Sequence, residues 1–249
     1  MEACQAEVAW IALAAISGQG FALAGAGALI THGLVDRPTQ DLDLFSPLDA
    51  GFEATVDSSH TVTGADFARL VVTRGDRSVQ IDLGRDWRQH PPVLLAVDPV
   101  LHLDDAVGNK VDAMIGRGLP RDYLDVAAAL RRYDREQLLE LGFRRDPGLR
   151  VVDVALAMHY LDQLSDIDFG DYHLTPEQTA AARRAFADWP RHPGRDRQGE
   201  RAHSQAQQIL APPAPGLRDS TRQRPGAPPA PLAGPARPPP PGPTPGPRR

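Results

Sequence analysis

Two aspartates separated by one residue, Asp41 and Asp43, lie in a short apolar run that predicts a strand. Because side chains alternate along a strand, both carboxylates should point to one face while Leu42 and Leu44 point to the other. Two like charges on an apolar strand are costly unless a cation lies between them, and a divalent metal ion is the natural candidate. The pair therefore predicts a metal site.

A third aspartate, Asp82, lies in the apolar run 79–83 and shares one strand face with Gln80. If this strand neighbours the one that carries Asp41 and Asp43, three carboxylates converge on one patch. Such a triad can hold two magnesium ions about 4 Å apart and bind a triphosphate for in-line displacement. A surface aspartate near a strand end is the alternative interpretation of Asp82.

Phosphate-binding groups are also predicted near the aspartate pair. Gly25, Ala26 and Gly27 follow a buried apolar run and form a tight turn into a helix, whose backbone amides could hold phosphate. Thr39, two residues before Asp41, could offer its hydroxyl to a phosphate or to a metal-bound water. A plain turn and a β-branched residue at the start of a strand are the alternatives.

The elements that must position these residues follow from the hydrophobic periodicity. Alternation and short apolar runs predict strands over residues 21–24, 41–45, 67–73 and 78–83, the last two joined as a hairpin. Helical spacing predicts helices over residues 2–17, 28–32, 104–116, 120–133, 135–142, 150–164 and 175–188. The expected fold class is therefore α/β (α+β), with a mixed sheet followed by a helical half.

Composition divides the 249 residues into unlike parts. Residues 190–249 contain 17 of the 25 prolines, no aromatic residue and a net charge of +7, whereas residues 1–189 carry −12. Residues 190–249 cannot bury enough apolar surface to fold alone, so a disordered tail is expected there. A proline-motif ligand and a basic arm for nucleic acid are the alternatives. We expect an α/β core over 1–100 and a helical part of the same unit over 101–189.

Cysteine usage and the N-terminal residues indicate a soluble cytoplasmic protein. The single cysteine, Cys4, excludes an internal disulfide framework. No lysine or arginine precedes Arg37, so the start lacks the basic region of a secretory signal. The uncharged stretch from Val8 to Val35 is interrupted by glycines, and neither apolar piece reaches the roughly 20 residues that a membrane-spanning helix needs.

Four blocks of the sequence resemble the AbiEii/AbiGii-type (MenT-like) nucleotidyltransferase toxins. The first two blocks match the signature hG[GS]…DhD of nucleotidyltransferases. The blocks are, in family order, residues 21–29, 32–45 with Asp41-Leu42-Asp43, 79–83 with Asp82, and 110–126 with Lys110 and Arg121-Asp122. The resemblance runs from about residue 15 to about residue 189. One departure is the Gly25-Ala26-Gly27 turn, which lacks the serine hydroxyl that the family places there.

The resemblance implies a DNA-polymerase-β-like fold and Mg²⁺-dependent transfer of a nucleoside monophosphate from an NTP. Its residues imply that Asp41 and Asp43 bind metal, that Lys110 is a catalytic and nucleotide-binding lysine, and that Asp122 is a catalytic acid. Within the matching blocks, the nucleotide-binding residues would be Gly25, Ala26, Gly27, Arg37, Thr39 and Lys110. The resemblance further implies an RNA or tRNA acceptor end and a cognate antitoxin.

Several alternatives remain open at this level. The chain could be an inactive member that binds nucleotide or antitoxin, or a transferase for a small molecule such as an aminoglycoside. Either Asp82 or Asp125 could complete the carboxylate set. Lys110 is the only lysine in the chain, which favours a specific role. It could also be an exposed helix lysine, or one paired with Asp104, Asp105 or Asp112.

Overall fold

The computed structural model describes most of the chain up to residue 206. The described residues are 1–39, 41–47, 62–64, 67–74, 77–191 and 201–206. Met1–Ala211 forms one compact unit, and Pro212–Arg249 is a separate one. The expectation of a disordered tail beyond residue 206 falls outside the described residues.

Five strands form one mixed sheet, in the order β1-β2-β5-β4-β3. The strands are β1 (Ala22–Leu23), β2 (Asp41–Ser46), β3 (Val62–Gly64), β4 (Phe67–Arg74) and β5 (Arg77–Arg85). The central pair, β2 and β5, is parallel, and the other neighbours are antiparallel. On the buried face of this pair, Leu42, Leu44, Ile81 and Leu83 are at most 2% exposed. This face anchors the sheet in the core and leaves the intervening side chains to the other face.

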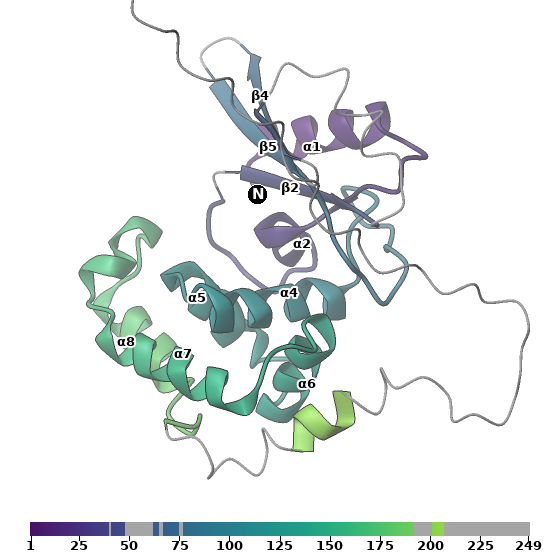
Figure 1. Ribbon diagram of the computed structural model, residues 1–249. Helices are drawn as coiled ribbons and strands as arrows, with labels where there is room; N and C mark the ends of the chain where they lie inside the picture. The colour runs from purple at the N-terminus through teal and green to yellow at the C-terminus, as the bar shows by residue number, and fades with distance from the viewer. Residues whose placement is uncertain (40, 48–61, 65–66, 75–76, 192–200, 207–249) are drawn as a thin grey trace, which may run out of the picture. The chain divides into compact units, whose positions relative to one another are not determined.

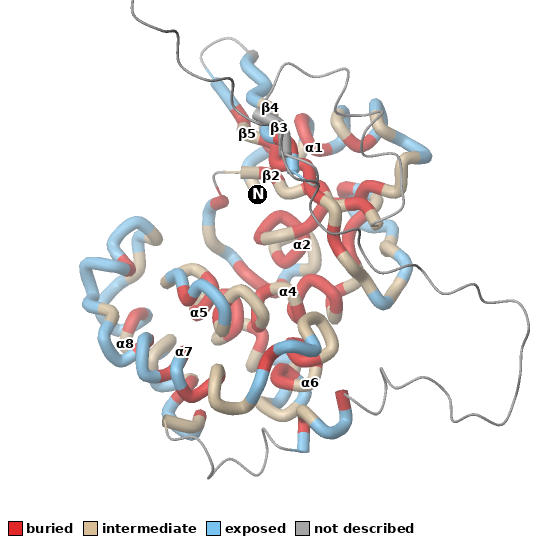
Figure 2. The backbone as a smooth tube through the Cα atoms, in the orientation of Figure 1, coloured by how far each residue is buried: buried red, intermediate tan, exposed pale blue. Residues whose placement is uncertain are grey.

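Helices flank the sheet and then form a separate layer below it (Figure 1). They are α1 (Ala3–Ala15), α2 (Gly25–Thr31), α4 (Leu103–Gly116), α5 (Pro120–Ala129), α6 (Arg135–Arg145), α7 (Val151–Gln163), the 3-10 helix η1 (Ile167–Tyr172) and α8 (Pro176–Arg184). Helix α4 contacts α2, α5, α6 and α7, and Figure 2 shows its backbone largely in the buried class. Helix α4 therefore joins the sheet layer to the helical layer.

Local sequence signals explain where several of these helices begin. Asp134 and Gln137 form a capping box at the start of α6, and Thr175 and Gln178 form another at the start of α8. Pro120 occupies the first turn of α5, where its missing N–H costs no helical hydrogen bond. These starts are set by neighbouring residues and could be read from the sequence.

The α/β class, with a mixed sheet followed by helices, is confirmed. The largest differences from the expected boundaries are at the ends of four helices. Helix α2 begins at Gly25 and not at residue 28, and α5 ends at Ala129 and not near Tyr133. Helix α6 ends at Arg145 and not at residue 142, and α8 ends at Arg184 and not at residue 188. Strand β3 and the 3-10 helix were not expected, because short segments carry too little periodicity to be recognised. No helix among the described residues is long and apolar enough to cross a membrane.

The folded part continues beyond the boundary expected at residue 189. Residues 201–206 are helical, and Ala202 and Ala206 are at most 1% exposed. The ring of His203 meets that of Phe143 edge to face, with centroids 5.0 Å apart. Arg201 pairs with Glu136 on α6 at 3.3 Å. Proline content therefore placed the end of the folded part too early, since two buried alanines carry almost no compositional signal.

Candidate active site

Three aspartates from the two central strands converge on one patch of the sheet. The parallel register places Asp43 of β2 opposite Asp82 of β5. One carboxylate oxygen from each of Asp41, Asp43 and Asp82 lies within 4.8 Å of the others. The predicted convergence is therefore present, and Asp82 rather than Asp125 completes this cluster.

The cluster carries more negative charge than its surroundings neutralise. Burial, followed by the charge of Asp41, raises the pKa of Asp43 to about 6, while Lys110 acts in the opposite direction. A divalent cation bound by the carboxylates would reverse this repulsion. Carboxylate oxygens are also the ligands that Mg²⁺ prefers. The residues present therefore fit a magnesium site.

Arg69 of β4 was not identified from the sequence, yet it contacts the cluster directly. Its Nε and Nη2 each donate to one oxygen of Asp82 at 2.8 Å. Because Arg69 and Asp82 are opposite each other in the β4–β5 register, the pairing depends on how the hairpin is aligned. Asp82 is thus held by a half-exposed arginine.

Gly25 lies directly against the second aspartate. Its φ is +55°, and a Cβ built on it would lie 1.7 Å from the Oδ2 of Asp43. Only glycine satisfies both conditions, since a side chain here would displace the carboxylate. Ala26 and Gly27 continue the first turn of α2 and are buried. The turn that was expected to bind phosphate is therefore next to the carboxylate cluster.

Thr39, in the segment before β2, contacts the Asp41 carboxylate. The Thr39 side chain is nearly buried, and its Oγ1 donates to an Asp41 carboxylate oxygen at 3.2 Å. The backbone carbonyl of Thr39 accepts a hydrogen bond from Gln5 of α1 at 2.6 Å. These contacts hold the residue that precedes β2 and orient the Asp41 carboxylate.

Lys110 of α4 is buried in an ionic network and is not an exposed helix lysine. Its Nζ lies 3.0 Å from an oxygen of Asp125 and 4.0 Å from an oxygen of Asp122. Both aspartates are fully buried on α5. Arg117 binds Asp122 through two hydrogen bonds of 2.8 and 2.9 Å. The sequence placed Lys110 and Asp122 in one motif, and the structure brings them together.

Arg37 lies in this network and does not point into open space. Its Nε and Nη2 donate to the two oxygens of Asp125 at 2.7 Å, and its Nη1 donates to the Pro38 carbonyl. Each guanidinium nitrogen therefore donates a hydrogen bond within the protein, and the expected nucleotide contact stays a prediction. Arg37 instead joins the segment before β2 to helix α5.

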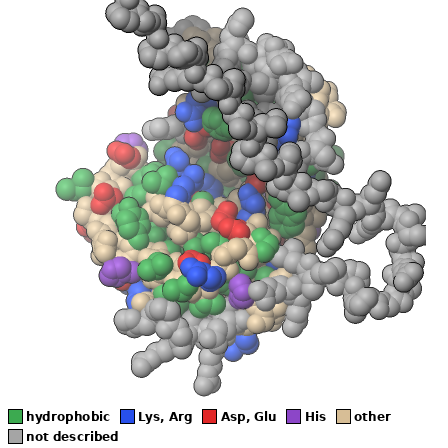
Figure 3. All heavy atoms as spheres, viewed as in Figure 1, with side chains coloured by type: hydrophobic (Ala, Val, Ile, Leu, Met, Phe, Trp, Pro, Cys, Tyr) green, Lys and Arg blue, Asp and Glu red, His purple; other side chains and the backbone are tan. Residues whose placement is uncertain are grey.

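The arrangement combines a metal-binding group with nearby positive charge. The charges of Lys110 and Arg121 lower the pKa of Asp43, so both side chains lie close enough to act on the cluster. In Figure 3, basic side chains gather between the sheet and the helices, with acidic side chains recessed among them. Such a site can bind a metal–triphosphate and stabilise negative charge on transferring phosphate.

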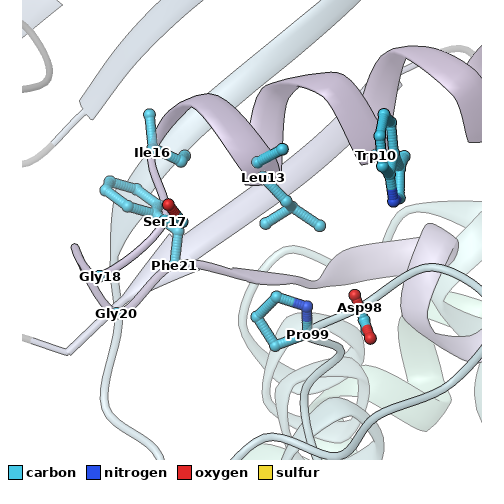
Figure 4. Close-up of a pocket in the computed structure, with 10 residues that line it drawn as sticks. Trp10, Leu13, Ile16, Ser17, Gly18, Gly20, Phe21, Asp98 and Pro99 are labelled. Atoms are coloured by element: carbon cyan, nitrogen blue, oxygen red, sulfur yellow. The ribbon is translucent and has the colours of Figure 1, made fainter.

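A separate cavity of about 410 Å³ lies between α1 and the segment at Asp98 and Pro99 (Figure 4). Trp10, Leu13 and Phe21 line it, and none of the cluster carboxylates does. Trp10 is 58% exposed at its rim. This cavity is distinct from the carboxylate site.

A family profile matches most of the chain. The profile described as "Nucleotidyl transferase AbiEii toxin, Type IV TA system" matches residues 11–208. The match covers the carboxylate cluster, the ionic network and the helical segment 201–206. No curated protein matches the chain.

The chain was also compared with solved structures, and the matches include MenT4 and JHP933. MenT4, a nucleotidyltransferase toxin from Mycobacterium tuberculosis H37Rv, is 19% identical with a TM-score of 0.55, over 83% of this chain and 91% of MenT4. JHP933 from Helicobacter pylori is 15% identical with a TM-score of 0.48, over 83% of this chain and 92% of its own. At this identity, the likeness to MenT4 shows a shared fold.

Proposed function

The chain belongs to the AbiEii nucleotidyltransferase toxin family, and we propose that it transfers a nucleoside monophosphate from an NTP to an RNA end in a Mg²⁺-dependent reaction. We favour tRNA as the acceptor. The observation that supports this most strongly is the convergence of Asp41, Asp43 and Asp82 beside a glycine turn and a buried lysine.

In the proposed reaction, an acceptor hydroxyl oxygen forms a bond to the α-phosphorus of the NTP and loses its proton to solvent. The bond between the α-phosphorus and the α,β-bridging oxygen breaks, and pyrophosphate leaves with that oxygen. Asp41, Asp43 and Asp82 would hold the two magnesium ions, with Arg69 keeping one end of Asp82 in place. When bound, the metal ions neutralise charge on the phosphate oxygens and lower the barrier to displacement.

Lys110 supplies a positive charge to the triphosphate in this proposal. Its ammonium group is compact, so it acts as a point charge where a forked guanidinium fits less well. Asp125 and Asp122 position the ammonium, and Arg37 and Arg117 in turn hold these two carboxylates. We therefore assign Asp122 and Arg37 positioning roles rather than direct contact with the nucleotide.

The first turn of α2 is proposed to contact the phosphates through its backbone. Gly25, Ala26 and Gly27 lie beside Asp43, so their amides are close to the place where a metal-bound triphosphate would lie. Backbone N–H groups can bind phosphate without the serine hydroxyl that the family signature contains. Thr39 contributes by orienting Asp41.

An active enzyme is favoured over an inactive binding protein. All three carboxylates and Lys110 are in place, and the raised pKa of Asp43 reflects a charge arrangement that is costly without a cation. A protein that had lost catalysis would gain stability by losing Asp43. The proposed substrates, an NTP and an RNA, would place the reaction in the cytoplasm.

Asp43→Asn is the most direct test. It removes one ligand charge with little change in volume, so the fold should persist while nucleotide transfer falls by more than about 100-fold. The measurement is incorporation from each of the four radiolabelled NTPs into total RNA in the presence of Mg²⁺. Asp166→Asn, the same change at a carboxylate that is 77% exposed, is the matched control and should transfer normally.

Two results would contradict the proposal. Normal transfer by Asp43→Asn would exclude the carboxylate cluster as the metal site. Wild-type protein that labels a small molecule such as an aminoglycoside, but no RNA, would replace the acceptor that we propose. The proposed antitoxin can be tested by co-expressing neighbouring reading frames and scoring the rescue of growth.

A further inference from the structure

A second pocket, of about 250 Å³, lies on the helical layer where α4 ends and α5 begins. Residues from α4, the connecting turn, α5 and α7 line it. They include Met114, Arg117, Gly118, Tyr123, Leu156 and Tyr160. The lining of the pocket therefore combines apolar and aromatic side chains with one basic residue, Arg117.

The ring of Tyr160 forms one wall of the pocket, packs against the backbone at Gly118 and is still accessible to solvent. Gly118 has a φ of +64°, and a Cβ built on it would lie 2.9 Å from the Cδ1 of Tyr160, so the backbone at Gly118 supports the ring closely. The Tyr160 residue nevertheless remains 45% exposed. Tyr123 donates a hydrogen bond of 2.7 Å to the Ala157 carbonyl, which attaches α7 to α5. The ring is therefore held on a rigid frame with part of its surface free.

Arg117 connects this pocket to the carboxylate site. Its Nε and Nη2 are bound by Asp122, whereas Nη1 takes no part in those two bonds, and the side chain is 50% exposed. Asp122 is also the neighbour of Lys110. Arg117 and Lys110 thus share Asp122, so the wall of the pocket belongs to the same ionic network as the lysine.

We propose that this pocket receives the terminal base of the RNA acceptor. The base would stack on Tyr160, and its phosphate would lie near the unbound side of the Arg117 guanidinium. Stacking on an aromatic ring beside a cation is how proteins bind unpaired nucleotides without reading their sequence. The inference rests on the proposed function and names the place where its acceptor binds.

The surroundings favour an RNA end over the base of the NTP. Leu119 and Leu156 are 39% and 61% exposed beside the pocket, so apolar surface continues past its edge. A mononucleotide needs only an enclosed base pocket, whereas a chain must be able to continue out of its pocket. The open side therefore suits the end of a polymer.

Tyr160→Ala and Tyr160→Phe test the proposal together. Because stacking is worth about 1–3 kcal/mol per base, Tyr160→Ala should raise the KM for RNA about tenfold, while the KM for NTP stays unchanged. Tyr160→Phe keeps the ring and should behave like the wild type. Trp10→Ala removes an aromatic side chain that is 58% exposed on α1, and it serves as the matched control.

Three outcomes would overturn the pocket assignment. An unchanged KM for RNA in a folded Tyr160→Ala protein would exclude a stacking role. An increased KM for NTP alone would assign the pocket to the donor base. If Tyr160→Ala left the RNA kinetics unchanged but a co-expressed protein no longer neutralised the toxicity of the variant, the pocket would be a protein interface instead.

A binding measurement separates this inference from the proposed function. Fluorescence anisotropy of a labelled single-stranded RNA, measured with Asp43→Asn protein, needs no transfer. Weaker RNA binding when Tyr160→Ala is added would support the pocket, even if wild-type protein transferred nothing to RNA. Equal binding with and without the Tyr160 ring would exclude the pocket, whatever the transfer assay shows.

Discussion

At the scale of single residues, the site depends on carboxylates of like charge that the fold holds close together. Asp43 lies between Asp41, Asp82 and the backbone of Gly25, and its pKa is raised to about 6, first by burial and then by Asp41. The charge of Asp82 is compensated, because Arg69 binds both of its carboxylate oxygens. Asp43 and Asp82 should therefore differ in how much their negative charge destabilises the metal-free protein.

Asp43→Asn should stabilise the metal-free fold in a pH-dependent way. A folded-state pKa above the ordinary value of 3.8 means that ionised Asp43 opposes folding above pH 6, and that this penalty disappears as the pH falls toward 4. Replacement by asparagine should raise the free energy of unfolding by up to about 3 kcal/mol at pH 7 and by little at pH 4. Urea unfolding with a chelator at both pH values measures the difference.

Asp82→Asn is the control for this experiment. It breaks a paired carboxylate, so it should give no gain in stability at pH 7. Equal gains for the two variants, or a gain for Asp43→Asn that persists at pH 4, would contradict the electrostatic account of Asp43.

At the scale of elements, an ionic network joins the segment before β2 to helices α4 and α5. Arg37 binds Asp125, Asp125 binds Lys110, and Lys110 lies next to Asp122, which Arg117 binds. Asp125 and Asp122 are fully buried, so each needs its cationic partners to remain ionised without a large cost. The network thus fixes Lys110 relative to the sheet.

Arg37→Met should destabilise the fold strongly. It leaves Asp125 buried with Lys110 as its remaining cationic partner in the network, and breaking a buried pair from one side costs about 3 kcal/mol. Arg150→Met is the matched control, since Arg150 binds Asp153 in an i,i+3 pair but is 70% exposed, and its loss should cost less than about 1 kcal/mol. Urea unfolding compares the two. Similar losses would show that burial of the Arg37 pair does not matter.

At the scale of the whole molecule, the folded unit ends later than composition indicates. The helical segment 201–206 contributes Ala202 and Ala206 to the core and covers the ring of Phe143. The compact unit extends to Ala211. The family match, which reaches residue 208, agrees with this boundary.

Two truncated chains distinguish the boundaries. A chain ending at residue 211 should keep the stability and transfer activity of the full protein. A chain ending at residue 189 exposes part of the surface around Phe143 and should lose about 2 kcal/mol of unfolding free energy. Thermal and urea unfolding of both chains provide the measurement. Equal stability would show that segment 201–206 adds nothing to the fold.

The sequence by itself determined what depends on near neighbours. The two-residue period of a strand put Asp41 and Asp43 on one face, capping residues set helix starts, and the motif order identified the family. Only the tertiary structure decided that Asp82 joins the pair, that Arg69 holds Asp82, that Arg37 binds Asp125, and that residues 201–206 return to the core. Each of these depends on strand register or on a contact between distant segments. Local spacing defines which face a side chain takes, but it carries no information about which distant element will lie opposite that face.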